Sequence, residues 1–144
     1  GWVQVDDRWY YFEPSGAMVT GWLRSDGAWY YLSGSGAMVA GWLLDHGTWY
    51  YMDSRTGAMR TGWVQVDDRW YYFEPSGAMA TGWLNSGGSW YYMSANGAMS
   101  TGWVNDRGAW YYMDSTGVMV TGTVSIDGRS SLFSSSGQWV GYAS

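Results

Sequence analysis

Several residue types that support common protein chemistries are scarce or missing in this chain of 144 residues. Cysteine is absent, which excludes a disulfide framework and a thiolate metal site. The single histidine, His46, stands in a turn sequence, where a solvated residue is expected rather than a catalyst. No nucleophile motif, metal-ligand cluster or phosphate-binding loop is present. We therefore expect no enzyme activity, no cofactor and no metal site in this chain.

Long apolar runs and a basic surface are also missing. No apolar run approaches the roughly 18 residues that a membrane-spanning helix needs. The seven basic residues are all arginine and are outnumbered by twelve acidic residues, for a formal charge of −5. This balance excludes the basic patch expected of a nucleic-acid-binding protein and favours cationic ligands. The paired carboxylates Asp6-Asp7 and Asp67-Asp68 occupy predicted tight turns and are interpreted as turn formers.

Aromatic residues are abundant instead, at 20% of the chain with 13 tryptophans and 13 tyrosines. Disordered chains are poor in aromatics, so the chain is predicted to fold. Gly-Trp recurs about every twenty residues, and such a short period indicates a repeat architecture. We expect a single module of repeat units at residues 1–20, 21–40, 41–61, 62–81, 82–101 and 102–121, followed by a degenerate unit at 122–144.

A second, longer period lies over the first. Residues 1–18 and 62–79 are identical, so the array looks like a triplet of units copied once. One interpretation is a helical stack with about three units per turn. The other is a recent duplication without geometric meaning, and the sequence alone leaves both open.

Each unit is predicted to be a β-hairpin. In the first unit, residues 2–5 and 9–12 are rich in aromatic and β-branched residues, as strands prefer. The intervening turn is Asp6-Asp7, and later units have Gly or Asp there, as two-residue turns with positive φ require. This register sets Trp2 opposite Tyr11, with Trp2, Trp9 and Tyr11 on one face. The other face carries Val3, Tyr10 and Phe12, a set that recurs in mostly apolar form and is expected to face the core.

The face with two tryptophans and one tyrosine is a candidate ligand site. Simple packing would tolerate aliphatic residues in some copies, yet both tryptophan columns persist in six units. Rings around a gap with a thioether nearby suit a quaternary ammonium ion, which cannot donate a hydrogen bond and must be held by the ring quadrupoles.

The pattern Gly-Trp-x6-Trp-Tyr-Tyr-x4-Gly-x-Met, present with little departure over residues 1–121, resembles the choline-binding repeat of Gram-positive cell-surface proteins. The resemblance implies an all-β, left-handed solenoid of stacked β-hairpins. It also implies that each choline lies between consecutive hairpins, caged by two Trp of one unit, a Tyr of the next and often a Met. The implied partner is choline or phosphocholine on wall teichoic or lipoteichoic acid, and the implied location is the extracellular surface of the bacterial cell wall.

Carried onto this sequence, the resemblance predicts five similar cages and a sixth that departs from the pattern. The second Tyr of each pair is assigned because the register places it on the Trp face, and a register slip would replace it by the first. In the sixth, Leu132 stands at the Tyr position and Trp139 at the Met position, where it would supply a third ring. The predicted sets are Trp2, Trp9, Tyr31 and Met38; Trp22, Trp29, Tyr51 and Met59; Trp42, Trp49, Tyr72 and Met79; Trp63, Trp70, Tyr92 and Met99; Trp83, Trp90, Tyr112 and Met119; and Trp103, Trp110 and Trp139.

Other readings of the aromatic array remain open at this stage. Related-looking repeats bind glucans or other surface glycans by stacking rings on sugar faces, and a purely structural spacer is a third interpretation. The terminal unit has lost its Trp-Tyr-Tyr, as expected of a unit that caps the stack. The resemblance also implies a second role, because a terminal hairpin can mediate homodimerisation in similar proteins. Because the chain opens within a repeat pattern, we also expect it to be part of a longer protein.

Overall fold

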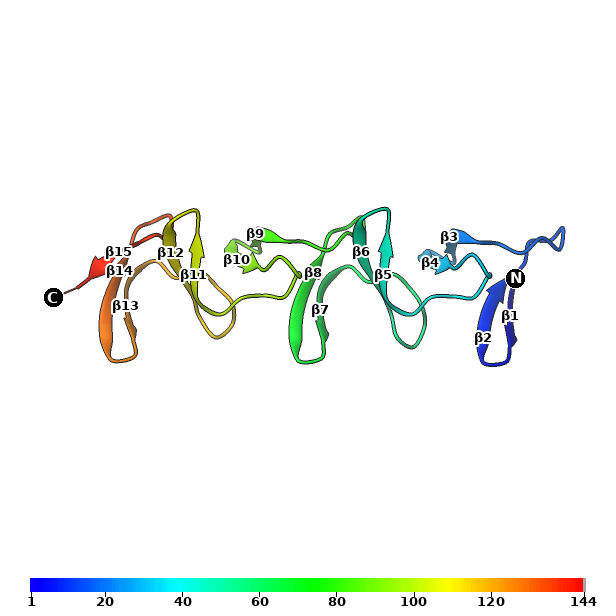
Figure 1. The fold of residues 1–144 in the computed structure, drawn as a ribbon, viewed down its shortest axis with the longest axis horizontal. Coiled ribbons are helices and arrows are strands. Elements are labelled where there is room, and N and C mark those ends of the chain that lie inside the picture. Colours follow the sequence, from blue (N-terminus) through cyan, green and yellow to red (C-terminus); the bar gives the residue numbers. More distant parts are fainter. Residues whose placement is uncertain (144) are drawn as a thin grey trace. The chain divides into compact units, whose positions relative to one another are not determined.

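The fold is all-β over residues 1–143, the part of the chain that the computed structural model describes. These residues form antiparallel hairpins and contain no helix, as the sequence predicted (Figure 1). The strands are β1 (Trp2–Val5), β2 (Arg8–Tyr11), β3 (Gly21–Ser25), β4 (Ala28–Leu32), β5 (Gly41–Asp45), β6 (Thr48–Met52), β7 (Gly62–Val66), β8 (Arg69–Phe73), β9 (Gly82–Ser86), β10 (Ser89–Met93), β11 (Gly102–Asp106), β12 (Ala109–Met113), β13 (Gly122–Ile126), β14 (Arg129–Phe133) and β15 (Trp139–Tyr142).

The hairpin register agrees with the prediction. Trp2 pairs with Tyr11 and Gln4 with Trp9, which puts Trp2 and Trp9 on one face of the first hairpin. The turn residues Asp6 and Asp7 have φ values of 50° and 65°. Positive φ at both central residues matches the right-handed twist of the strands and explains why Asp and Gly predominate in these turns.

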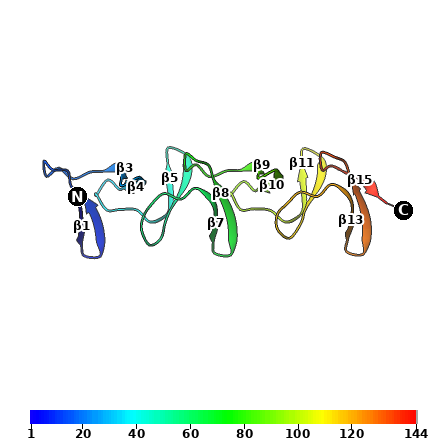
Figure 2. The ribbon, with the colours of Figure 1, turned by 180° about the vertical axis from the view of Figure 1, so that it is seen from behind.

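After each hairpin, a second loop brings the chain back alongside the end of the second strand. In the first unit, the Glu13 N–H donates to the Ala17 carbonyl at 2.8 Å, and Phe12 forms an isolated bridge with Met18. The same bridge recurs in each of the first six units. In the last unit a full strand, β15, takes this place and extends the β13–β14 hairpin into a three-stranded sheet near the C-terminus (Figures 1 and 2).

The core consists of two of the three predicted inner columns. In every hairpin after the first, the residue that ends the second strand is completely or almost completely buried, namely Leu32, Met52, Phe73, Met93, Met113 and Phe133. Leu43, Val64 and Val104 of the first-strand column are also buried. The tyrosines between these columns, such as Tyr30, are only half-buried. This part of the core prediction needs correction, because these rings face gaps between hairpins rather than the interior.

Consecutive repeats are joined by a backbone hydrogen bond at one fixed position. The Met38 N–H donates to the Trp9 carbonyl at 2.8 Å, and the Met119 N–H donates to the Trp90 carbonyl at 2.8 Å. Three further bonds of the same kind join Met59 to Trp29, Met79 to Trp49 and Met99 to Trp70. Each methionine backbone is thereby fixed against the second tryptophan of the preceding repeat.

The glycine of the Gly-x-Met motif makes room for the methionine of the preceding repeat. A Cβ at Gly57 would lie 2.5 Å from the Met38 sulfur, and one at Gly137 would lie 2.3 Å from the Met119 sulfur. Both glycines also have φ near 80–90°, where a side chain is strained. The motif therefore combines a required turn conformation with a required close approach.

The chain divides into two compact units. One contains residues 1–64 and 73–79, and the other contains residues 65–72 and 80–144, so the division falls within the β7–β8 hairpin. The first, second and third hairpins belong to one unit, and the fifth, sixth and seventh belong to the other.

Candidate aromatic cages

The two tryptophans of a hairpin form two walls at nearly a right angle. Trp22 and Trp29 have ring centroids 6.5 Å apart with an interplanar angle of 82°. The Trp103–Trp110 pair has 6.3 Å and 86°. The second tryptophan of each pair is about 40–46% exposed, so this wall is accessible from solvent. The sequence predicted that each pair would share a face, and the register places them so.

The second tyrosine of each Tyr-Tyr pair supports the first tryptophan of its own hairpin. Tyr31 is the cross-strand partner of Trp22, and their rings meet edge-to-face at 5.1 Å. Tyr11 meets Trp2 in the same way at 5.2 Å. The same contact recurs for the other assigned residues, in the pairs Trp42–Tyr51, Trp83–Tyr92 and Trp103–Tyr112.

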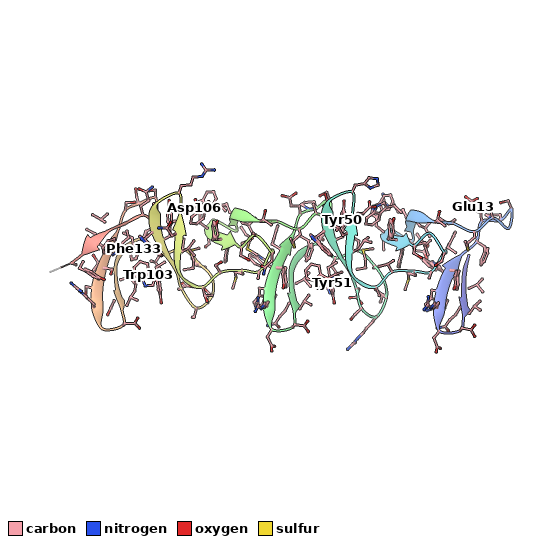
Figure 3. The ribbon with its side chains drawn as sticks, in the orientation of Figure 1. Glu13, Tyr50, Tyr51, Trp103, Asp106 and Phe133 are labelled. Carbon is pink, nitrogen blue, oxygen red and sulfur yellow. The ribbon has the colours of Figure 1, made fainter. Side chains whose placement is uncertain are left out.

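The first tyrosine of the next hairpin instead reaches across the gap. Tyr30 meets the Trp2 ring at 4.9 Å, Tyr50 meets Trp22 at 4.9 Å, and Tyr111 meets Trp83 at 4.7 Å. Tyr50 and Tyr51 are neighbours on β6 and so point to opposite faces (Figure 3). The assignment of Tyr31, Tyr51 and Tyr112 to the gaps therefore needs correction. The register had not slipped, but each gap is bordered by the Trp face of one hairpin and the opposite face of the next.

Two gaps of this kind enclose cavities of similar composition. Trp2, Trp9, Tyr30 and Met38 line a cavity of about 260 Å³, which we call the first cage. Arg55 and Thr56, from the second loop of the third repeat, complete its lining. The structure brings both predicted tryptophans and the predicted Met38 together here.

The fifth cage repeats this arrangement in the other compact unit. Trp83, Trp90, Tyr111 and Met119 line a cavity of about 390 Å³. Ser135 and Ser136 occupy the place that Arg55 and Thr56 take in the first cage. A cage thus draws side chains from three consecutive repeats.

The terminal cage has a different third wall. Trp103, Trp110, Trp139 and Tyr142 line a cavity of about 310 Å³. Trp139 stands 6.5 Å from Trp103 at 87° and so adds a third ring to the lining of this cavity. Leu132 stays 40% exposed and outside the cavity lining. Tyr142 was not predicted. The available signal was an aromatic residue close after Trp139 in a unit without its own Tyr pair.

Tyr142 is itself held by a cation. The Arg129 guanidinium carbon lies 3.4 Å from the Tyr142 ring centroid, and Tyr142 meets Trp139 edge-to-face at 5.2 Å. The terminal cage is therefore preorganised by a cation–π contact within its own three-stranded sheet.

The indole N–H of the first tryptophan is anchored differently from repeat to repeat. Trp2 donates to the Ser25 hydroxyl at 3.4 Å, whereas Trp22 donates to the Asp45 carboxylate at 3.0 Å. Trp83 donates to the Asp106 carboxylate, also at 3.0 Å. The acceptor always lies 23 residues further on, at the end of the next first strand.

Two first strands end instead in an apolar residue, β7 in Val66 and β13 in Ile126, so that position offers no polar side chain to the tryptophan of the preceding repeat. Trp103 of the sixth repeat packs against Phe133 of the next repeat at 5.7 Å (Figure 3). Trp42 of the third repeat packs likewise against Phe73, at 5.9 Å. In the first compact unit a serine-anchored, an aspartate-anchored and a phenylalanine-backed tryptophan follow one another. The second unit repeats the last two steps with Trp83 and Trp103, which gives the longer period a structural counterpart.

The hydrogen bond from Trp22 lowers the pKa of Asp45, and a further contact from His46 acts in the same direction. The His46 Nδ1 lies 3.1 Å from the same carboxylate, and its side chain is 92% exposed. His46 is therefore a solvated turn residue, as the sequence predicted. The carboxylate remains ionised next to the second cage.

Some predicted residues lie where the two compact units divide. The third and fourth predicted cages, with Trp42, Trp49, Tyr72 and Met79 and with Trp63, Trp70, Tyr92 and Met99, draw on residues of both units. Their assembly stays a prediction. The second predicted cage lies within one unit. There the Trp22 ring contacts both Trp29 and Tyr50, and the Met59 N–H donates to the Trp29 carbonyl.

The cage geometry suits a bulky organic cation. Its walls are aromatic rings, whose faces are electron-rich, and a methionine thioether. Asp45 and Asp106, which bind the indoles of Trp22 and Trp83, add negative charge beside two of the cages. Residues 1–143 hold no group of three or more His, Cys, Asp or Glu side chains that could bind a metal ion. No helix in this part of the chain has the length and apolar character needed to cross a membrane.

Comparison with known proteins agrees with this chemistry. The family model of the Choline-binding repeat matches residues 1–40, 19–61 and 60–101, and that of the Putative cell wall binding repeat matches residues 101–119. No curated protein sequence gives a match.

Among solved structures, CbpJ from Streptococcus pneumoniae is 47% identical, with a TM-score of 0.91 over 97% of this chain and 48% of that one. Choline binding protein F from the same species is 44% identical, with a TM-score of 0.89 over 97% and 47%. A pneumococcal cell wall endolysin from phage Cp-1, solved in complex with choline, is 35% identical, with a TM-score of 0.61 over 83% and 36%. The chain thus spans about half the length of the first two.

Proposed function

The chain belongs to the choline-binding repeat family, and we propose that its cages each hold the trimethylammonium head of one choline. The observation that carries this proposal is the recurrence of a box of rings with a methionine wall, in the first and fifth cages. Two tryptophans at nearly right angles and a tyrosine from the next repeat surround a cation on several sides. A quaternary ammonium needs no hydrogen-bond acceptor, and such a box offers none at its centre.

The expected strength of one cage is modest. Each ring contributes roughly 0.5–1 kcal/mol when exposed and about 2 kcal/mol when desolvated. Three rings then give about 2–5 kcal/mol, which corresponds to a dissociation constant on the order of millimolar. A polymer that carries many cholines engages several cages at once, and such linkage raises avidity by about 10² to 10⁴. The repeat number therefore matters more than the affinity of any single cage.

This arithmetic supports attachment to a choline-bearing polymer rather than capture of free choline. We propose that the chain is a non-catalytic module that attaches a longer protein to choline residues of teichoic or lipoteichoic acid outside the cell. The endolysin among the similar structures shows that such repeats also occur in cell wall enzymes. Any catalysis would then belong to another part of the full protein.

Glycan binding fits the geometry less well. A sugar ring stacks on one open aromatic face, which calls for a platform. The tryptophan pairs stand at 82–87° to each other and form corners instead. A corner closed by a tyrosine and a methionine has the shape of a compact cation rather than a flat ring.

Retention on a diethylaminoethyl matrix, which displays tertiary amines, tests this proposal. We expect free choline to elute the protein at concentrations where sodium chloride of equal ionic strength does not. The matched control replaces the exposed second tryptophans Trp9 and Trp90 by leucine, which should weaken retention without unfolding the chain. Elution by salt or dextran but not by choline would refute choline binding and favour the glycan reading.

A further inference from the structure

The first cage has a positively charged residue in its lining. Arg55 lines this cavity together with Trp2, Trp9, Tyr30 and Met38. It belongs to the second loop of the third repeat, which is one residue longer than the corresponding loops of the other repeats. The insertion therefore adds a guanidinium group to a cavity that is otherwise suited to a cation.

The loop holds Arg55 in place by its backbone. The Asp53 carboxylate accepts the N–H of Arg55 at 2.9 Å and the N–H of Thr56 at 3.0 Å. The other carboxylate oxygen of Asp53 accepts a hydrogen bond from the Arg60 guanidinium at 3.3 Å. The carboxylate of this loop is thus already paired with a different arginine.

The Arg55 side chain has no ion-pair partner among residues 1–143, and the residue is exposed. Its charge is therefore available to a ligand in the cavity. A bare quaternary ammonium would be repelled by this charge, whereas an anion attached to the ammonium would be attracted.

We propose that Arg55 makes the first cage selective for choline esterified to phosphate over free choline. This inference rests on the proposed function, because the trimethylammonium group still occupies the aromatic box. The guanidinium at the rim pairs with a phosphate oxygen, as arginine does in many phosphate sites. Thr56 is the neighbouring polar residue in the lining of the same cavity.

The fifth cage provides a control within the same chain. It has the same ring and methionine set, but Ser135 and Ser136 stand at the rim in place of Arg55 and Thr56. Neutral serine hydroxyls offer a phosphate no positive charge and hence no ion pair, so this cage should bind the two ligand forms nearly equally. Since each compact unit holds one of the two cages, the comparison does not depend on how the units are placed.

The experiment follows the indole N–H signals of Trp9 and Trp90 by ¹⁵N-resolved NMR in the full chain at neutral pH. Three probes are titrated separately: choline, phosphocholine and glycerophosphocholine. We expect phosphocholine to bind about threefold to fivefold more tightly than choline at Trp9, as a partly exposed ion pair allows, and about equally at Trp90. Comparison of the two esters distinguishes a terminal phosphate from a phosphodiester as the preferred form.

Two variants make the result specific. Arg55→Gln keeps the loop N–H groups and should abolish the ester preference at Trp9 while leaving choline binding there equal or stronger. Ser135→Arg should create the preference at Trp90. High salt should reduce the preference in the unaltered chain, because the contact is partly screened by solvent ions.

The outcomes separate this inference from the proposed function. Choline is expected to change the indole N–H signals at both cages. If it does so but Trp9 shows no ester preference, or if the preference survives Arg55→Gln, only the role of Arg55 is overturned. An absence of any choline effect at Trp9 and Trp90 would overturn the proposed function, and the role of Arg55 with it.

Discussion

The indole N–H of Trp22 donates to the Asp45 carboxylate at 3.0 Å, so a wall of the second cage is hydrogen-bonded to a full negative charge. The corresponding bond of Trp2 goes to the neutral Ser25 hydroxyl at 3.4 Å. A carboxylate bound to the indole edge makes the ring face more negative and also attracts a cation directly. Cages that share the same ring composition therefore differ in their electrostatics.

We expect Asp45→Asn to weaken choline binding at the second cage by about twofold to fivefold, the range of a partly exposed charge interaction. The amide still accepts the indole hydrogen bond, so the change removes charge and preserves the geometry. The Trp29 indole signal in a choline titration measures this cage. Asp106→Asn should act likewise on Trp90, and Ser25→Ala should leave the Trp9 affinity within twofold. Equal affinities before and after Asp45→Asn would rule out a role for the charge.

Acid should destabilise the fold through three aspartates whose pKa values are lowered. Hydrogen bonds from Trp22 and His46 lower the pKa of Asp45, and the N–H groups of Arg55 and Thr56 lower that of Asp53. Burial raises the pKa of Asp114, but hydrogen bonds from Thr116 and Val118 outweigh it.

A depressed folded-state pKa contributes stability above the ordinary value of about 3.9, and this stability is lost as pH falls through the lowered values. These three carboxylates stay ionised near neutral pH, so we expect them to leave the melting temperature unchanged there. The melting temperature should then fall below about pH 4. Melts followed by near-ultraviolet circular dichroism between pH 2 and 6 measure this. In Asp53→Asn the decline should be shallower, and an unchanged slope would contradict the assignment.

The two tyrosines of a pair should respond differently to substitution. Tyr30→Leu removes a wall of the first cage and should weaken choline binding at Trp9 by about threefold to tenfold, the value of one ring contact. Tyr31→Leu removes the ring that supports Trp22 and should chiefly lower the melting temperature. Choline titration and thermal unfolding of both variants separate these effects. A larger loss at Trp9 from Tyr31→Leu than from Tyr30→Leu would restore the assignment made from sequence.

Gly57→Ala should disturb the first cage from outside its lining. The new Cβ would lie 2.5 Å from the Met38 sulfur at a φ of 79°, so both a clash and backbone strain result. We expect a loss of about 2–4 kcal/mol in unfolding free energy, together with weaker choline binding at Trp9.

Gly27→Ala is the matched control, because its φ is 81° and no atom lies within 4 Å of the added Cβ. It should cost only the strain, about 1–2 kcal/mol. If both variants lose the same stability, the methionine contact does not explain the Gly-x-Met spacing.

Choline should stabilise the chain as a whole. A ligand that binds only the folded form adds about 1.4 kcal/mol per site at ten times its dissociation constant. Cage walls from successive repeats meet across the ligand, so occupancy should also strengthen the stack. We expect the melting temperature to rise with choline at tens of millimolar, with tetramethylammonium acting similarly and sodium chloride as the control. A melt that choline leaves unchanged would count against occupied cages.

The hairpins were predictable from sequence because their determinants are local. The turn pair Asp6-Asp7 and the alternation through Trp9, Tyr10 and Tyr11 fix the register within about a dozen residues. The tryptophan pairs follow from the same register, since both lie on one face.

The identity of the cage tyrosine was not predictable in this way. Whether Tyr30 or Tyr31 meets Trp2 depends on which face the second hairpin turns toward the first, and this depends on contacts about 30 residues apart in the chain. The place of Arg55 in a cage was also not predictable, because the tryptophans of that cage belong to the first repeat and Arg55 belongs to the third. The third unit is one residue longer than its neighbours in the sequence, but only the fold places the longer loop at a cavity rim.

The first and fifth cages share their walls among successive repeats, with tryptophans from one, tyrosine and methionine from the next and a rim from the third. An internal repeat consequently gives its tryptophans to one binding site and its tyrosine and methionine to the site before it. Duplication of a single twenty-residue segment can lengthen such an array and add a whole site without any new residue type. A deletion of the same length removes one site and lets the remaining halves rejoin, so valency can change over generations while the chemistry of recognition stays constant.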